Sequence, residues 1–280
     1  MTGIWSCGRF RLALDPPLVM GVVNVTPDSF SDGGEHFTPD AAIAHGRELA
    51  AAGADILDVG GESTRPGSDE VPPADELARV LPVVEALAGP DGPGLPVSID
   101  TRHADVAGPC VEAGASIIND VAGFRDAAML ELAVSCDAGV VVMHMLGEPK
   151  TMQDEPEYED VVREVSAWLA ARTAALETAG VAHDRIVIDP GIGFGKTLEH
   201  NLALLRGLPE LRRVGFPVLV GASRKRFIGA LTGEAEPRMR LGGSLAVATT
   251  AVLGGAAVLR VHDVAETVQA VRVAAALREG

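Results

Sequence analysis

Cysteines are few in this sequence, and long apolar runs and targeting signals are missing. Its 280 residues include three cysteines, Cys7, Cys110 and Cys136, and no Cys-x-x-Cys spacing. An odd number without that spacing argues against a disulfide framework or a zinc site, and it fits a reducing cytoplasm. No run approaches the ~18 apolar residues of a membrane span, and the N-terminus lacks the residue order of a signal peptide. We therefore expect a soluble, cytoplasmic protein.

Cations and aromatic residues are also in the minority. Lys and Arg number 23 against 39 Asp and Glu, so the formal net charge is −16 at pH 7. An acidic surface argues against nucleic acid and against anionic membranes as partners. Aromatic residues make up 4% of the chain and hydrophobic residues 47%. This composition suits a Val-rich parallel sheet under Ala-rich helices. Because cations are few, any local cluster of them is informative.

Eight short apolar runs, each followed by a helix-like segment, organise the chain. The runs lie at 18–25, 55–61, 96–101, 116–121, 139–145, 185–189, 218–220 and 257–261. The helical segments lie at 40–52, 72–88, 103–113, 126–136, 157–179, 199–207, 224–231, 240–253 and 263–277. Repeated strand–helix units favour an α/β fold with a parallel sheet, and eight of them favour a closed (β/α)8 TIM barrel. A doubly wound open sheet is the alternative, but no Gly-x-Gly-x-x-Gly follows the first run.

The chain shows no fixed-period repeat, low-complexity tract or linker. A length of 280 residues is typical of one α/β barrel, so we expect a single domain over residues 1–280. Residues 1–17 form an N-terminal extension that carries no signature. Within it, the mixed segment from Ile4 to Leu14 predicts a short β-hairpin that plugs the bottom of the barrel.

Polar residues follow the apolar runs where a parallel sheet binds its ligands. Ser223, Arg224 and Lys225 come just past the buried run that ends at Val220, and the carboxyl edge of parallel strands is the usual binding edge. The strand ends carry two chemical groups. The acceptors and amides are Asn24, Asp100, Asn119 and Asp189, and the cationic residues are Arg65, Lys225, Arg260 and His262.

The last strand and the loop before it predict an anion site. In Leu259-Arg260-Val261-His262 the period of two puts Arg260 and His262 on the same face. Lys225 comes from the neighbouring unit, and the loops after strands seven and eight often bind phosphate in such barrels. We therefore expect a phosphate-type group near these three side chains.

The strand-end carboxylates leave two interpretations open. A buried Asp is costly unless it is paired or hydrogen-bonded, so Asp100 and Asp189 could form ion pairs with Lys225 or Arg260. Alternatively, two carboxylates and the amide of Asn119 suit a flat, nitrogen-rich ring with amino and ring N–H donors. The ligand would then have such a ring at one end and an anion at the other.

Five segments together identify a family. They are Asn24–Gly34 (NVTPDSFSDGG), Gly60–Gly67 (GGESTRPG), Ile188–Lys196 (IDPGIGFGK), Gly221–Lys225 (GASRK) and Arg260–Asp263 (RVHD). In this order they resemble the signatures of the dihydropteroate synthases, and the resemblance runs from about residue 19 to the C-terminus. It implies a (β/α)8 barrel, usually a homodimer. Such enzymes join 4-aminobenzoate to (7,8-dihydropterin-6-yl)methyl diphosphate and release 7,8-dihydropteroate and diphosphate, in folate biosynthesis.

The resemblance also implies roles for individual residues, which fall into four groups. The pterin would be held by Asp100, Asn119, Asp189 and Lys225, with Met143 against its face. The diphosphate would contact Asn24, Thr64, Arg65, Arg260 and His262, with Mg²⁺ as cofactor at Asn24. The aminobenzoate pocket would be lined by Phe30, Pro66, Phe194 and Ser223. The catalytic residues would be Asp32, Asp100, Lys225, Arg260 and His262.

This set of residues suits a dissociative displacement. A diphosphate that leaves needs its charge neutralised, and Mg²⁺ with cationic side chains can do this. Two other activities remain as alternatives. A methyltetrahydrofolate–corrinoid methyltransferase would share the pterin residues but would not need the 26–34 loop or the anion site. A catalytically silent paralogue would have no need of both early loops. The helices at 240–253 and 264–277 could form a dimer face or simply pack on the barrel.

Overall fold

The fold is known from a computed structural model. It describes residues 3–26, 38–62, 70–147, 152 and 156–278. Of the sequence-predicted site residues, Phe30, Asp32, Thr64, Arg65 and Pro66 lie outside the described residues.

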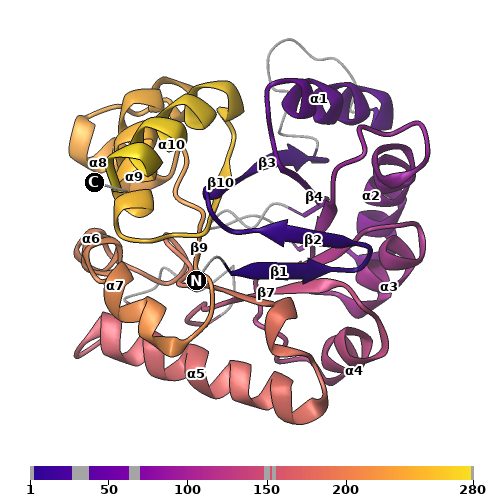
Figure 1. The fold of residues 1–280 in the computed structure, drawn as a ribbon, viewed down its shortest axis with the longest axis horizontal. Helices are drawn as coiled ribbons and strands as arrows, with labels where there is room; N and C mark the ends of the chain where they lie inside the picture. The colour runs from indigo at the N-terminus through magenta and orange to yellow at the C-terminus, as the bar shows by residue number, and fades with distance from the viewer. Residues whose placement is uncertain (1–2, 27–37, 63–69, 148–151, 153–155, 279–280) are drawn as a thin grey trace.

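Eight parallel strands form a barrel that is almost completely closed (Figure 1). They are β3 (Leu18–Asn24), β4 (Ile56–Gly60), β5 (Val97–Asp100), β6 (Ile117–Asp120), β7 (Gly139–Met143), β8 (Ile186–Asp189), β9 (Leu219–Val220) and β10 (Val258–Val261). Their order is β8-β7-β6-β5-β4-β3-β10-β9. A parallel bridge between Ile188 and Val218 joins the two end strands, and the Ile188 N–H donates to the Pro217 carbonyl at 2.9 Å. The predicted (β/α)8 barrel is confirmed, and the open sheet is excluded.

Helices surround this barrel (Figure 1). They are α1 (Pro39–Ala51), α2 (Pro73–Ala88), α3 (Ala104–Glu112), α4 (Ala127–Ser135), α5 (Val161–Ala179), α6 (Leu198–Arg206), α7 (Leu208–Leu211), α8 (Arg226–Thr232), α9 (Leu241–Leu253) and α10 (Val264–Arg278), with the 3-10 turns η2 (His183–Arg185), η3 (Arg212–Val214) and η4 (Pro237–Met239). The main core lies between the strands and these helices, and it is built mostly from Val, Leu, Ile and Ala. None of the described helices is both long and apolar enough to cross a membrane.

Two helices begin later than the sequence predicts. The helix expected from residue 157 begins at Val161, because the Asp160 side chain caps it by accepting from the Arg163 N–H at 3.1 Å. The helix expected from residue 224 begins at Arg226. Arg224 has a φ of 60°, which is left-handed and cannot continue a right-handed helix.

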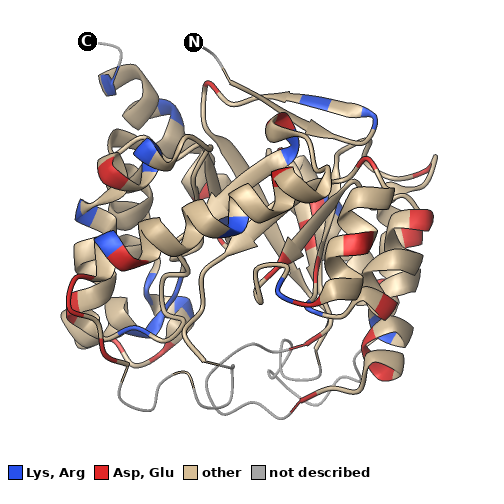
Figure 2. Ribbon diagram, turned by 90° about the horizontal axis from the view of Figure 1, so that it is seen from below, with Lys and Arg blue, Asp and Glu red and all other residues tan. Residues whose placement is uncertain are grey.

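The predicted N-terminal hairpin is present and closes the bottom of the barrel. Strands β1 (Ile4–Cys7) and β2 (Phe10–Ala13) pair antiparallel, with Trp5 opposite Leu12. Trp5 is fully buried, and its indole N–H donates to the Arg185 carbonyl at 2.8 Å. The hairpin packs on apolar residues that face the barrel interior: Leu18, Met20, Ile56, Ile117, Val141, Val187, Leu219 and Val258. In the side view of Figure 2 it lies across the end near which α10 finishes.

Trp5→Ala should therefore lower the free energy of unfolding by ~3–5 kcal/mol, since it leaves a cavity and strands the Arg185 carbonyl. Urea unfolding measures this. Ile4→Ala is the matched control, because Ile4 is 48% exposed on the same strand, and it should change stability by no more than about 0.5 kcal/mol. A Trp5→Ala protein as stable as the control would show that the hairpin is not part of the cooperative core.

Candidate active site

On most strands the inner face of the barrel changes from apolar to polar toward the carboxyl end, whereas β7 stays apolar and ends at Met143. Side chains two or four residues apart on a strand share a face. The apolar residues that pack on the hairpin therefore show which later residues of the same strands also face inward. Met20 leads to Asn24, Ile117 to Asn119, Val141 to Met143, Val187 to Asp189, and Val258 to Arg260. Asn24, Gly60, Asp100 and Asn119 also lie side by side in register across β3 to β6. The sequence-predicted strand-end residues thus meet in one layer at the carboxyl ends of the strands.

Arg260 is the centre of this layer. Its Nε donates to Asp58 Oδ2 at 2.6 Å, and its Nη2 donates to Asp100 Oδ2 at 2.6 Å. Nη1 donates to no other group among the described residues. Asp100 thus forms the ion pair with Arg260 that one of the two interpretations expected. Arg260 lies among the carboxylates as well as on the face predicted to bind an anion.

Asp58 belongs to this site, although the sequence analysis missed it. It is fully buried in the middle of β4, and the amide of Asn119 lies 3.4 Å from both its carboxylate oxygens. The residues predicted for the site all lie at strand ends or in the loops after them, whereas Asp58 lies inside its strand. A signal was available, because Asp58 is a charged residue inside an apolar run, two positions after the inward-facing Ile56.

A glycine-rich loop places a second group of residues beside the first. Asp189 ends β8, and its Oδ1 accepts from the Gly191 N–H at 2.7 Å. Gly191 and Gly193 have φ values of 69° and 84°. A Cβ at Gly193 would lie 3.0 Å from Cδ of Lys225. Glycine therefore allows both the turn and the close approach of the lysine stem.

Lys225 connects the predicted pterin residues with the predicted aminobenzoate wall. Its Nζ donates to the Ile192 carbonyl and lies 4.4 Å from the centre of the Phe194 ring. The Phe194 ring also packs against a small buried cluster that includes Met143. A flat ring placed against Met143 would thus have Phe194 and Lys225 as neighbours.

Ser223 and His262 form a third group at the mouth. The Ser223 hydroxyl accepts from the His262 backbone N–H at 3.3 Å and lies 3.1 Å from its ring Nδ1. Ser223 follows β9 and His262 follows β10, so this contact joins the loops after strands seven and eight, where the sequence predicts an anion.

Burial sets the ionisation of these side chains. It raises the pKa of Asp100 to about 7, although Arg260 opposes the rise and Asp58 adds to it. It also raises the pKa of Asp189, against the attraction of Lys225. The pKa of Lys225 is lowered to about 8 by burial, although Asp189 opposes this. Three carboxylates and two cations therefore share one buried to half-buried layer, and the protonation of Asp100 and Lys225 changes near neutral pH.

The arrangement matches a known family. A model described as "Pterin binding enzyme" matches residues 20–262. A dihydropteroate synthase of Neisseria meningitidis serogroup B is 51% identical over 98% of this chain and 97% of its own.

Solved structures agree with this match. A Xanthomonas albilineans dihydropteroate synthase with 4-aminobenzoic acid has a TM-score of 0.93 and 49% identity, and it covers both chains completely. One from Burkholderia cenocepacia, complexed with 7,8-dihydropteroate, has a TM-score of 0.89 and 46% identity over 99% of this chain and 97% of its own.

The chain belongs to the dihydropteroate synthase family of pterin-binding enzymes. It is therefore an enzyme, a transferase of folate biosynthesis, as the sequence motifs implied.

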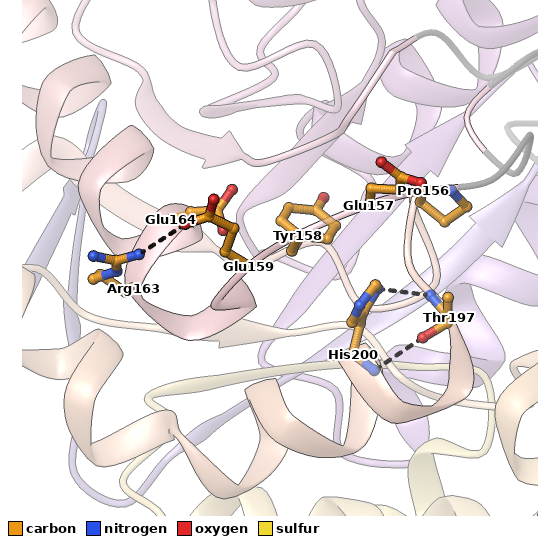
Figure 3. Close-up of a pocket in the computed structure, with 8 residues that line it drawn as sticks. All are labelled: Pro156, Glu157, Tyr158, Glu159, Arg163, Glu164, Thr197 and His200. Carbon is orange, nitrogen blue, oxygen red and sulfur yellow. Dashed lines mark hydrogen bonds and ion pairs between the residues drawn. The ribbon is translucent and has the colours of Figure 1, made fainter.

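Two other features lie near the mouth but outside the strand-end layer. An open groove with a volume of about 700 Å3 lies at the start of α5 and α6. Its lining residues, drawn in Figure 3, include three glutamates and Tyr158. None of the family's strand-end residues lines it.

Glu62, Glu76 and His103 bring possible metal ligands within 4.8 Å of one another. Glu62, however, already binds the Arg102 guanidinium at 3.2 Å, and His103 Nδ1 lies 2.8 Å from Glu76 Oε2. These contacts explain the cluster as a hydrogen-bonded network.

Asp58→Asn should weaken dihydropterin binding by ~1–3 kcal/mol, which is about 5- to 150-fold in Kd, because Arg260 and Asn119 lose a charged acceptor. Calorimetric titration measures the affinity. Asp120→Asn is the control: Asp120 is equally buried, but it binds the backbone N–H groups of Ala122 and Phe124. That variant should lose stability and keep its affinity. If the two variants bind dihydropterin with equal affinity, Asp58 is not part of the binding site.

Proposed function

We propose that this chain condenses 4-aminobenzoate with (7,8-dihydropterin-6-yl)methyl diphosphate to give 7,8-dihydropteroate and diphosphate. The observation that carries the proposal is the single inward-facing layer in which Asp58, Asp100, Asn119, Asp189 and Arg260 meet. Related enzymes support the choice of one substrate and of the product, because their structures hold 4-aminobenzoic acid and 7,8-dihydropteroate.

The pterin ring would bind in the carboxylate layer. Its amino and ring N–H groups are donors, and Asp100, Asp189 and the Asn119 amide supply acceptors. Lys225 would donate to a ring acceptor, and Met143 would cover one face. The Arg260–Asp58 pair keeps the layer preorganised, since neither partner is left as an unpaired buried charge.

Mg²⁺ fits the diphosphate end through Asn24. Mg²⁺ prefers oxygen ligands and is usually held by one or two protein oxygens together with substrate phosphates. Asn24 lies at the end of β3 and carries an amide oxygen of the kind that such a ligand set uses. When bound there, the ion would neutralise charge on the diphosphate.

The reaction would begin with cleavage of the bond between the methylene carbon and the diphosphate oxygen. The bonding electrons leave with diphosphate, whose charge Arg260 and His262 stabilise, with Thr64 and Arg65 as further proposed contacts. The positive charge that remains on the methylene carbon is shared with the electron-rich dihydropterin ring, and the nearby carboxylate of Asp100 stabilises it. The arylamine nitrogen then attacks that carbon and loses one proton. No strong base is needed.

The aminobenzoate would lie between the Phe194 loop and Ser223. The Phe194 ring offers an aromatic wall, and Ser223 offers a hydroxyl at the mouth. Phe30 and Pro66 complete the proposed pocket, and Asp32 is a further proposed catalytic residue. These three lie outside the described residues.

We also propose that the chain forms a homodimer through α8, α9 and α10. Among the described residues, five of the eight exposed large apolar side chains lie on these helices and on η4 between them: Leu231, Met239, Leu253, Val273 and Leu277. The three helices pack together on one side of the barrel (Figure 1). Association there would cover an apolar face and leave the mouth open.

Diphosphate release from the purified protein tests the proposed function. With dihydropterin methyl diphosphate and Mg²⁺, release should accompany dihydropteroate formation once 4-aminobenzoate is added, and a chelator should abolish it. Arg260→Ala should lower kcat/KM by an amount that corresponds to ~2–4 kcal/mol of lost transition-state stabilisation, as expected for the loss of a key charge stabiliser. Tight pterin binding without turnover would instead favour the silent paralogue, and methyl transfer to a corrinoid would favour the methyltransferase.

The pH dependence of kcat/KM should be bell-shaped. The rate should rise through about pH 7, as Asp100 loses its proton and becomes an acceptor, and fall above about pH 8, as Lys225 loses its proton and its charge. Because the ionisable groups of the layer interact, both apparent pKa values describe the layer as a whole. In Lys225→Arg the cation stays protonated, so the falling limb should move to higher pH. A falling limb that does not move would exclude Lys225 as its source.

A further inference from the structure

We propose that Arg224 and Asp263 form a positioning pair that holds the loops after β9 and β10 together and so places Ser223, Lys225 and His262. Neither residue touches the carboxylate layer. Their role follows from where they lie in the chain: Arg224 stands between Ser223 and Lys225, and Asp263 directly follows His262. The inference rests on the proposed function for its effect on turnover, but the pair itself is visible in the structure.

The backbone of Arg224 is the first observation. Its φ of 60° is one of only two positive values at non-glycine positions among the described residues. A left-handed conformation is unfavourable for a residue with a long side chain, and it persists only where the surroundings impose it. It occurs here between two residues of the candidate site.

Three contacts impose this conformation. The Arg224 backbone N–H donates to the Ser244 hydroxyl at 3.0 Å, and its carbonyl accepts from Arg240 Nη1 at 2.9 Å. Its guanidinium forms a two-pronged pair with Asp263: Nε donates to Oδ2 at 3.0 Å and Nη2 donates to Oδ1. Both hydrogen-bonding groups of the Arg224 backbone are thus bound by α9 or by Arg240, which precedes α9. The Arg224 side chain binds the loop that follows β10.

The pair acts on the site through the backbone. The left-handed turn at Arg224 reverses the chain between Ser223 and Lys225, so the hydroxyl reaches His262 while the lysine reaches Ile192 and Phe194. The ion pair fixes the neighbouring loop at Asp263, one residue from the same His262. Loss of either charge should loosen the Ser223–His262 contact and leave the strands in place.

Two single variants break the pair from opposite sides. Arg224→Gly keeps a residue that adopts the left-handed turn without strain, and Asp263→Asn keeps the size of the partner. Each should lower kcat/KM for the pterin diphosphate about tenfold. The double variant should lose no more than either single variant, because both remove the same interaction. Losses that add would overturn the proposal. If Arg224→Gly does not fold, Asp263→Asn decides alone.

Arg278→Ala is the matched control. Arg278 forms an ion pair with Asp15 at 2.6 Å, with both side chains partly exposed, at the far end of α10, the helix that follows Asp263. This variant should keep kcat/KM within about twofold of wild type. An equal loss of kcat/KM in the control would show that the effect of the Arg224–Asp263 pair is one of general stability.

A readout without turnover separates this inference from the proposed function. The imidazole nitrogen signals of His262, assigned by comparison with His262→Gln, should shift in Arg224→Gly and Asp263→Asn and not in Arg278→Ala, because only the first two disturb the Ser223 contact. Unchanged signals would reject the positioning pair. If the variants show these shifts but the wild-type protein releases no diphosphate, the proposed function is wrong and the positioning pair is still supported.

Discussion

The Arg260 guanidinium between Asp58 and Asp100 is the interaction on which the mouth of this barrel depends. A buried carboxylate or guanidinium without a partner would be very costly. Pairing on two sides lets the layer keep its charges and still present acceptors to a ligand. The layer holds more carboxylates than Arg260 alone can neutralise, so Lys225 must contribute, and its depressed pKa reflects the cost of that burial.

The hairpin at the other end makes this arrangement possible. A barrel interior must be filled along its whole length, and here the lower half is filled by Trp5 and the apolar residues above it. The upper half is then free to be polar. One strand pattern, apolar first and polar two residues later, thus supplies both the stability of the barrel and the chemistry of its mouth. Asp58, Asp100, Asn119, Asp189 and Arg260 lie on strands and are held in place by the sheet, whereas Phe194, Ser223, Lys225 and His262 lie on the loops that follow strands.

Much of the site could be predicted from local pattern. The period of two placed Arg260 and His262 on one face, and the motifs pointed to the family. Two errors had local causes. Asp58 was overlooked because it lies within an apolar run and not at its end. Arg224 was assigned to the helix that follows it, whereas contacts from α9 and the residue before it hold Arg224 in a left-handed turn.

The strand–helix repeat, the two faces of each strand and the family can all be read from the sequence, because they depend on neighbours within a few residues or on contiguous motifs. The tertiary structure alone decided which charges pair. Arg260 meets Asp58 and Asp100 across separations of 202 and 160 residues, and Trp5 meets Arg185 across 180. The periodicity of a sequence cannot predict contacts over such separations. They form because closure of the barrel brings the first and last strands side by side.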